Sequence, residues 1–258
     1  MPQSSLSPTA RAALLRARDM PLSYGVRTYA VPGDSDRVLV VLGEAHLKLG
    51  AASALGKEIV DAFDLRGVET FQRRQVVLGT LLGFLIHFPR WLLRQLSFGI
   101  IKDSTIVDAR AAKTGTTVAI EKTDHVPFAL HAASIYLTLF FLVAGAQLAV
   151  SFVFGVRGPR EDLVDEIMPW LTLVTLVFEL HMILLIPAWV MRRQKIAWMI
   201  HPAIGLVSAR DMLMAKGTAR MLNDHPSAGA ALVIMGRAHL PGFEREIIDH
   251  HGYRRIPL

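Results

Sequence analysis

The sequence contains no cysteine, which excludes disulfide bonds and thiolate ligands for a metal ion. Any metal site must therefore be built from His, Asp and Glu side chains. The first 20 residues lack the apolar core of a secretory signal peptide, so we expect the segment before the first membrane span to begin in the cytoplasm. The sequence also lacks a basic stripe interleaved with aromatic residues, so nucleic acid is not an expected partner. The formal net charge of +6 instead indicates Lys and Arg beside anionic membrane lipid.

Long apolar stretches are present in the second half of the chain. Hydrophobic residues make up 52% of the sequence and the mean hydropathy is +0.38, which indicates that part of the chain lies in lipid. Residues 126–156 contain no Lys, Arg, Asp or Glu, and residues 167–191 contain one carboxylate, Glu179. Both stretches exceed the roughly 20 residues that a helix needs to cross a bilayer. Because the link between them is short and polar, they predict a transmembrane helical hairpin over residues 126–191, with membrane lipid as a partner.

The charges that flank the two spans predict their orientation. Lys113 and Lys122 precede the first span and Arg192, Arg193 and Lys195 follow the second, whereas the connecting loop has two Arg against four acidic residues. The positive-inside rule then places both outer flanks in the cytoplasm. We therefore expect an integral membrane protein with two spans, with both termini and the site domain on the cytoplasmic side.

Short apolar runs outside the hairpin alternate with helical patterns, which is typical of an α/β fold. We expect residues 1–125 and 192–258 to form the N-terminal and C-terminal halves of one cytoplasmic α/β domain. Strands are predicted at 38–42, 64–69, 116–122 and 231–235. Helices are predicted at 9–18, 49–63, 103–115 and 202–222, with an interfacial or core helix at 75–89 and a last helix and tail within 242–258.

Each predicted strand ends in a residue that can bind a metal ion or transfer a proton: His46, Glu69, Glu121 and His239. Both histidines lie in a Gly-x-x-His motif, whose glycine allows the chain to turn directly after the strand. Because ligands of open α/β sheets bind at the carboxyl ends of strands, we expect these side chains to share one site. Two imidazoles with carboxylates suit a divalent Mn, Co, Zn or Fe ion, which would activate water for hydrolysis. The plain alternative for Glu69 and Glu121 is a solvated strand end.

Two further charged features lie in apolar surroundings. Arg210 and Asp211 are adjacent in an otherwise apolar helix. Arg210 is a candidate for stabilising an oxyanion, and the alternative is an intrahelical surface pair. Glu179 lies near the middle of the second span, where a charged carboxylate costs at least about 2.5 kcal/mol. We expect it to be protonated or to pair with His131 or His181. The plain interpretation is a polar contact in the hairpin or a homodimer, and the functional one is a proton or substrate contact within the membrane.

Four stretches, GEAHL, GVETFQRR, ARDMLMA and VIMGRAHLPGF, resemble the ordered motifs of the TraB/PrgY family, which is related to GumN and the TIKI proteins. The residues that match are Val68, Glu69, Arg74, Arg210, Asp211 and 236–242. Glu44 stands where TraB proteins usually have Thr. Its Gly-Glu-x-His motif is more similar to the ChaN and erythromycin esterase branches of the wider superfamily.

The resemblance implies two related α/β halves that share a mixed sheet flanked by helices, with the motif residues meeting in one cleft. TIKI proteins are regarded as metal-dependent proteases and PrgY-like proteins restrain peptide pheromones, so the implied activity is metal-dependent hydrolysis of a peptide or small-molecule substrate. On that analogy the metal ligands are His46, His239 and Glu69, and the catalytic residues are Glu69, Arg210 and Glu44. Two alternatives stay open: a non-catalytic membrane protein that sequesters a peptide, haem or metal, and a metal-independent esterase that uses His and Glu directly.

Overall fold

The fold is taken from a computed structural model that describes residues 6–45, 50–98, 102, 104–157, 161–191 and 197–258. The chain divides into two compact units. The first, which we call the sheet unit, comprises Met1–Gln72, Pro89–Asp124 and Arg210–Leu258. The second, the helical unit, comprises Arg73–Phe88 and His125–Ala209.

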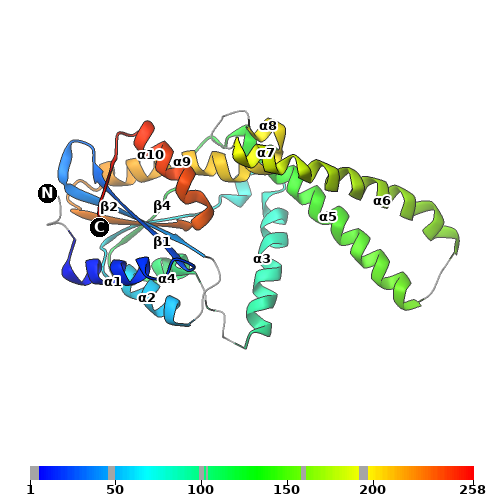
Figure 1. The fold of residues 1–258 in the computed structure, drawn as a ribbon, viewed down its shortest axis with the longest axis horizontal. Coiled ribbons are helices and arrows are strands. Elements are labelled where there is room, and N and C mark those ends of the chain that lie inside the picture. The colour runs from blue at the N-terminus through cyan, green and yellow to red at the C-terminus, as the bar shows by residue number, and fades with distance from the viewer. Residues whose placement is uncertain (1–5, 46–49, 99–101, 103, 158–160, 192–196) are drawn as a thin grey trace. The chain divides into compact units, whose positions relative to one another are not determined.

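The described part of the sheet unit contains a six-stranded mixed sheet in the order β4-β3-β5-β2-β1-β6 (Figure 1). The four strands β4, β3, β5 and β2 run parallel, whereas β1 is antiparallel to both β2 and β6. This arrangement confirms the expected α/β class and mixed sheet. The strands are β1 (Tyr24–Val31), β2 (Asp34–Glu44), β3 (Leu65–Val68), β4 (Thr116–Ala119), β5 (Ala230–Gly236) and β6 (Arg254–Ile256).

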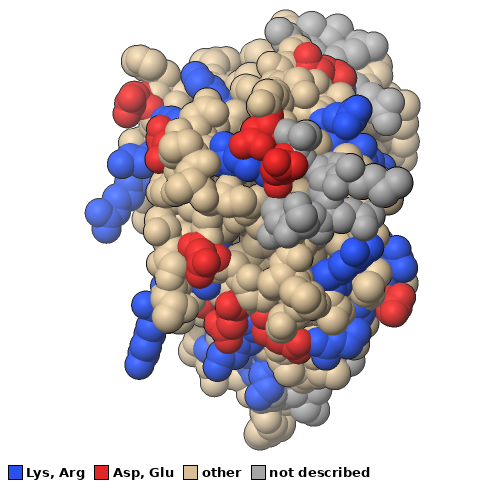
Figure 2. Space-filling model, turned by 90° about the vertical axis from the view of Figure 1, so that its left-hand side faces the viewer, with Lys and Arg blue, Asp and Glu red and all other residues tan. Residues whose placement is uncertain are grey.

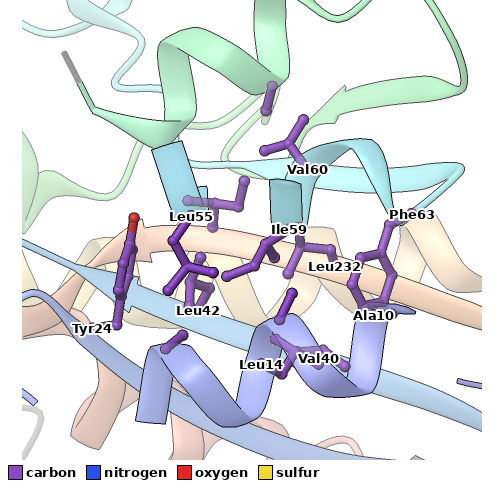
Figure 3. Close-up of a cluster of buried hydrophobic side chains, with 14 of the residues drawn as sticks. Ala10, Leu14, Tyr24, Val40, Leu42, Leu55, Ile59, Val60, Phe63 and Leu232 are labelled. Atoms are coloured by element: carbon purple, nitrogen blue, oxygen red, sulfur yellow. The ribbon is translucent and has the colours of Figure 1, made fainter. Parts of the chain in front are cut away.

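Helices cover both faces of this sheet (Figure 1). On one face lie α1 (Pro8–Arg18), α2 (Gly50–Asp61) and α4 (Thr105–Ala111), and on the other lie α9 (Gly205–Asp224) and α10 (Leu240–Asp249). Figure 3 shows the first face, where side chains of α1 and α2 pack on apolar residues of β2 and β5. A second cluster, which includes Met214, Met221 and Phe243, packs on the opposite face. Because β2 and β5 are buried on both faces, they are continuous apolar runs in the sequence.

The helical unit carries the apolar stretches. Its elements are η1 (Arg73–Gln75), α5 (Phe128–Arg157), α6 (Glu161–Ile183), α7 (Leu185–Val190), α8 (Ala197–Ile200) and η2 (Pro202–Ile204), and α3 (Gly79–Leu96) begins in it. Two segments, Phe128–Phe152 and Met168–Val190, are long and apolar enough to cross a membrane. Only 6% and 11% of their most apolar windows are buried, so neither resembles the core helix of a soluble protein.

Several predicted elements need correction. The strands β1 and β6 were not predicted, because Gly25, Arg27 and Thr28 interrupt the apolar residues of β1 and because β6 has only three residues. The helix expected at 75–89 is α3, which starts at Gly79 and continues through Pro89 to Leu96. The domain limits at 125/126 and 191/192 stay predictions, although residues 73–88 and 192–209 group with the apolar helices in the two-unit division. His46 lies outside the described residues.

The surface drawn in Figure 2 carries charges of both signs. Lys and Arg side chains are interspersed there with Asp and Glu, and neither sign forms an uninterrupted band.

Candidate functional site

The carboxyl ends of neighbouring parallel strands bring acidic and imidazole side chains together in the sheet unit. Glu69 follows β3 directly, Glu121 comes two residues after β4, and His239 closes the 3-10 turn η3 (Arg237–His239) after β5. Because β4, β3 and β5 are adjacent in the sheet, these ends share one edge. Helix α9 contributes Arg210 and Asp211 to the same group.

Arg210 lies at the centre of a buried ion cluster. Its Nε donates to Glu121 Oε2 at 3.0 Å, and its Nη2 donates to Glu121 Oε1 at 2.8 Å and to Glu69 Oε1 at 2.5 Å. Arg210 is 9% exposed, Glu69 8% and Glu121 3%. Burial by itself would lower the pKa of Arg210, but the charges of Glu121 and Glu69 raise it above its usual range. The guanidinium therefore stays charged, and the ring of Phe71, 5.3 Å away, covers it.

Glu69 is held on its other side by backbone groups. Its Oε2 accepts the N–H of Gly236, and its own N–H donates to the carbonyl of Ile234 at 3.0 Å. Arg110 Nη2 donates to the Glu69 carbonyl at 3.0 Å and to the Thr70 hydroxyl at 2.8 Å. The Glu69 carboxylate is thus held by β5 and α9, and α4 holds its backbone.

His239 and Asp211 form a second buried pair beside this cluster. His239 Nδ1 lies 2.6 Å from Asp211 Oδ1, and His239 Nε2 lies 3.7 Å from Glu69 Oε1. Burial raises the pKa of Asp211 above its usual range, against the lowering effects of the His239 hydrogen bond and of Arg210. With ionised Asp211 as acceptor, the imidazole proton is assigned to Nδ1, which leaves the Nε2 lone pair directed towards Glu69.

Gly242, in the VIMGRAHLPGF motif, makes this pair possible. A Cβ atom at Gly242 would lie 1.7 Å from Asp211 Oδ2, so helix α10 can approach Asp211 this closely only without a side chain there. The stretch HLPGF therefore contains a local signal for the contact, although nothing in it identifies Asp211 as the partner.

Glu44, predicted as catalytic, makes structural contacts. It is 1% exposed, and its carboxylate accepts hydrogen bonds from the Ser104 hydroxyl and from the N–H groups of Thr105 and Ile106, at the N-terminus of α4. Such an acidic cap satisfies backbone donors and complements the helix dipole. Its catalytic role stays a prediction. Glu44 also pairs with Gly236 in the parallel ladder of β2 and β5, so the two strands that carry Gly-x-x-His motifs are neighbours.

Comparisons with family models of proteins, with curated proteins and with solved structures find no match. The function is therefore inferred from side-chain geometry and from the sequence motifs.

The predicted metal ligands are only partly covered by the structure. His239 and Glu69 face each other, but His46 lies outside the described residues. Within the described ranges, no group of three or more His, Asp and Glu side chains is arranged to hold a metal ion. Arg74, the remaining motif residue, lies exposed in η1 and belongs to the helical unit.

Glu179 does not pair with either of the two histidines expected as its partners, and the homodimer contact stays a prediction. It is exposed on α6, and no pairing with His131 or His181 is found among the described contacts. His131 Nδ1 instead accepts the N–H of Val77 at 3.2 Å. His181 Nδ1 lies 2.8 Å from the Tyr136 hydroxyl. A carboxylate at the outer surface of an apolar helix has no protein group to lower its energy in lipid.

Sequence reasoning missed His201, which precedes η2. It is fully buried, and neither of its ring nitrogens has a hydrogen-bond partner within the described residues. Its ring stacks on that of His181 with centroids 4.7 Å apart, and the Tyr136 ring lies 4.9 Å away. Burial, and next the neighbouring His181, lower the pKa of His201. A single histidine before a proline carries no pattern that predicts this cluster.

Proposed function

We propose that this chain is a membrane-anchored, metal-dependent hydrolase of the TraB type that acts on a peptide or a similar acyl substrate. One observation carries the proposal. A buried carboxylate, Asp211, orients the imidazole of His239, whose second nitrogen faces the carboxylate of Glu69 at 3.7 Å. Two electron-pair donors facing each other at this distance suit a shared cation or a shared water molecule.

The described residues supply two of the ligands that a divalent ion would need at this site. Histidine ligands of metals usually donate their other ring N–H to a carboxylate, and Asp211 supplies that carboxylate to His239. We propose His239 and Glu69 as two ligands and His46 as the third. The ion would lower the pKa of a bound water molecule, which supplies the nucleophile for hydrolysis.

The chain's own residues then have distinct tasks. Glu69 is placed to take the proton from the attacking water, since its carboxylate lies beside His239. Arg210 is best assigned a positioning role. Within the described residues, its hydrogen bonds go to Glu69 and Glu121, so the guanidinium orients the Glu69 carboxylate. The sequence-based role of Arg210 in stabilising an oxyanion would require it to give up one of these contacts.

The two Gly-x-x-His strands support the family proposal. Because β2 and β5 pair in parallel, the segments that follow Gly43 and Gly236 leave the sheet at the same edge. We propose that these strands belong to the two related halves of the domain, with the apolar helices inserted between them.

The membrane anchor is proposed to be a hairpin of α5 and α6–α7. Tyr136 of α5 contacts Phe178 of α6, and both candidate spans are exposed along most of their length. We propose that the loop at 157–166 faces outward and that the site domain is cytoplasmic. Glu179 then supports a homodimer, because contact with a second copy would remove a carboxylate from lipid.

The decisive assay is hydrolysis of a peptide library by the purified full-length chain, with added Mn, Co or Zn and with a chelator. We expect turnover that requires metal and falls at least about a hundredfold in His239→Ala. The matched control is His250→Ala, since His250 is exposed at the end of α10. Metal content measured by mass spectrometry should fall in His239→Ala and not in the control. Unchanged turnover in His239→Ala would rule out the proposed site.

The Asp211–His239 pair also favours a second candidate, a metal-independent hydrolase. A carboxylate-oriented imidazole is itself a general base, and this role needs no third ligand. Turnover that persists in chelator and is lost in Asp211→Asn would select this mechanism over the metal-dependent one.

Topology can be tested separately because the chain has no native cysteine. A single cysteine placed in the 157–166 loop should react with a membrane-impermeant maleimide on intact cells. A cysteine at Ser227, exposed in the sheet unit, should react only after the membrane is disrupted. The reverse pattern would contradict the orientation.

A further inference from the structure

A cavity of about 630 Å³ lies in the sheet unit, at the outer side of β1. Its lining includes four arginines that come from distant parts of the chain: Arg18, Arg27, Arg237 and Arg255. The volume falls in the range of roughly 300–1,000 Å³ that small-molecule sites occupy. Arg237 and Leu240 of the 236–242 motif line this cavity, but none of the residues proposed for the hydrolase site does.

The length of β6 explains why the cavity exists. β6 pairs with only Thr28, Tyr29 and Ala30 of β1, although β1 begins at Tyr24. The first half of β1 is therefore not covered by β6, and the cavity lies along it. Added peptide strands are poorly suited to this edge, because the Tyr24 N–H already donates to Met20 and the Val26 carbonyl accepts from Arg27. A small molecule fits the geometry better than an extended peptide.

The lining is strongly cationic. Among the described residues, the carboxylate paired with lining arginines is Glu244, 3.7 Å from Arg27 Nε and 3.1 Å from Arg255 Nη1. One side-chain carboxylate against four guanidinium groups leaves a surplus of positive side-chain charge around this open cavity. Such a surplus favours an anion with more than one negative charge.

The hydrogen bonding of two of the arginines suits an anionic ligand. The Nε atom of Arg27 is buried and has no hydrogen-bond acceptor within the described part of the chain. The Glu244 carboxylate, at 3.7 Å, is too far from this Nε to accept a hydrogen bond, so an anionic acceptor nearer to Nε would supply the missing bond. Arg237 Nη1 donates to the carbonyl of Pro21, so its guanidinium is already held beside the cavity. Planar guanidinium groups bind phosphate and carboxylate oxygens in pairs.

The remaining walls are apolar and come from residues such as Val26, Leu240 and Ile256. A ligand that fills the cavity therefore combines a charged group with a less polar body. We propose that this cavity binds a small phosphate monoester, with the phosphate held by Arg27 and Arg237. The phosphate is carried either by a lipid such as phosphatidic acid or by a soluble metabolite. The proposal does not depend on the hydrolase activity.

Isothermal titration calorimetry of the purified full-length chain in uncharged detergent tests this proposal. The probes are inorganic phosphate, a hexose 6-phosphate and dihexanoyl phosphatidic acid. We expect saturable, salt-sensitive binding of at least one phosphate monoester. Loss of a charge-assisted hydrogen bond in Arg237→Gln should weaken it about tenfold or more. Tighter binding of the lipid than of the sugar phosphate assigns a lipid ligand, and the reverse order assigns a soluble one.

Two variants make the test specific. Arg254→Gln is the matched control, because Arg254 is exposed on β6 and does not line the cavity. Arg237 is also exposed, so Arg237→Gln should fold normally, and Arg27→Lys, which keeps the charge but removes the planar guanidinium of this half-buried residue, should also weaken binding. Absence of saturable binding for all three probes would overturn the proposal. Equal weakening by Arg254→Gln and Arg237→Gln would do the same, since it would indicate unspecific attraction to a basic surface.

Discussion

Removal of Arg210 should destabilise the sheet unit by more than any exposed charge does. In Arg210→Met, Glu69 and Glu121 would lose the guanidinium that binds both, yet stay almost completely buried. Both carboxylates contact Nη2, so their oxygens lie no more than about 5 Å apart, and at an effective dielectric constant of about 20 their repulsion is about 3 kcal/mol. Breaking a buried ion pair by removing one partner typically costs about 3–5 kcal/mol, and we expect a loss in that range.

The assay is urea unfolding of the purified full-length chain in detergent and chelator, followed by pulse proteolysis of the sheet unit. Proteolysis is preferable to fluorescence because three of the four tryptophans, in α6, α7 and α8, belong to the helical unit. If the loss comes from unpaired buried charge, adding Glu69→Gln and Glu121→Gln to Arg210→Met should restore most of the stability. Arg245→Met is the control, since Arg245 pairs with its neighbour Glu246 near the surface and should contribute little.

Two results would refute this reasoning. Arg210→Met could prove as stable as the wild type, which would mean that water or another cation compensates the carboxylates. Alternatively, the triple variant could be no more stable than Arg210→Met alone, which would assign the loss to packing of the side chain rather than to charge.

Three further predictions follow from single contacts, each measured by the same unfolding assay. Alanine usually stabilises a helix relative to glycine, but Gly217→Ala should lower the free energy of unfolding by more than about 2 kcal/mol, because its Cβ would lie 1.6 Å from the Ile120 carbonyl oxygen. The control Gly145→Ala, which has open space around its Cβ, should not lower it. Glu44→Gln should lower the free energy of unfolding by about 1–2 kcal/mol, because it removes the charged cap at the N-terminus of α4. An unchanged urea midpoint would argue against a capping role. Burial raises the pKa of Tyr253 to about 12 from 10.0, so its stabilising contribution is present below pH 10 and lost as pH rises towards 12. The stability of Tyr253→Phe relative to wild type should therefore rise between pH 10 and 12, and a constant difference would contradict the shift.

The central strands could be predicted because burial on both faces leaves a local signal. The apolar runs at 38–42 and 231–235 lie within β2 and β5, each a few residues longer in the structure. In contrast, β1 contains Gly25, Arg27 and Thr28, which break the apolar pattern. The Tyr, Val and Thr residues of β1 favour a strand by propensity, but no continuous apolar run marks the segment as one. Its pairing with β2 and β6 is a tertiary contact that the sequence pattern does not show.

Part of the candidate site could be predicted from the sequence, but its contacts could not. Strand ends and motifs identified Glu69, Glu121 and His239, since strand topology alone brings them to one edge of the sheet. No local pattern shows that Arg210 binds both glutamates or that Asp211 binds His239, because these pairs are separated by 28 to 141 positions. Sequence spacing predicts which residues share a helix face, whereas these contacts depend on how α9 crosses the strand ends.

The charge of the cluster bears on the choice between the two mechanisms. Glu69, Glu121 and Asp211 provide three carboxylates near one guanidinium, so the buried group carries surplus negative charge when all are ionised. The raised pKa of Asp211 shows one way to reduce this surplus, because a proton on Asp211 neutralises it. A protonated Asp211, however, would no longer be the carboxylate that accepts the Nδ1–H of His239 and orients its ring. A divalent cation between His239 and Glu69 would balance the charge and leave the Asp211–His239 hydrogen bond intact, which is the physical reason to prefer the metal-dependent mechanism.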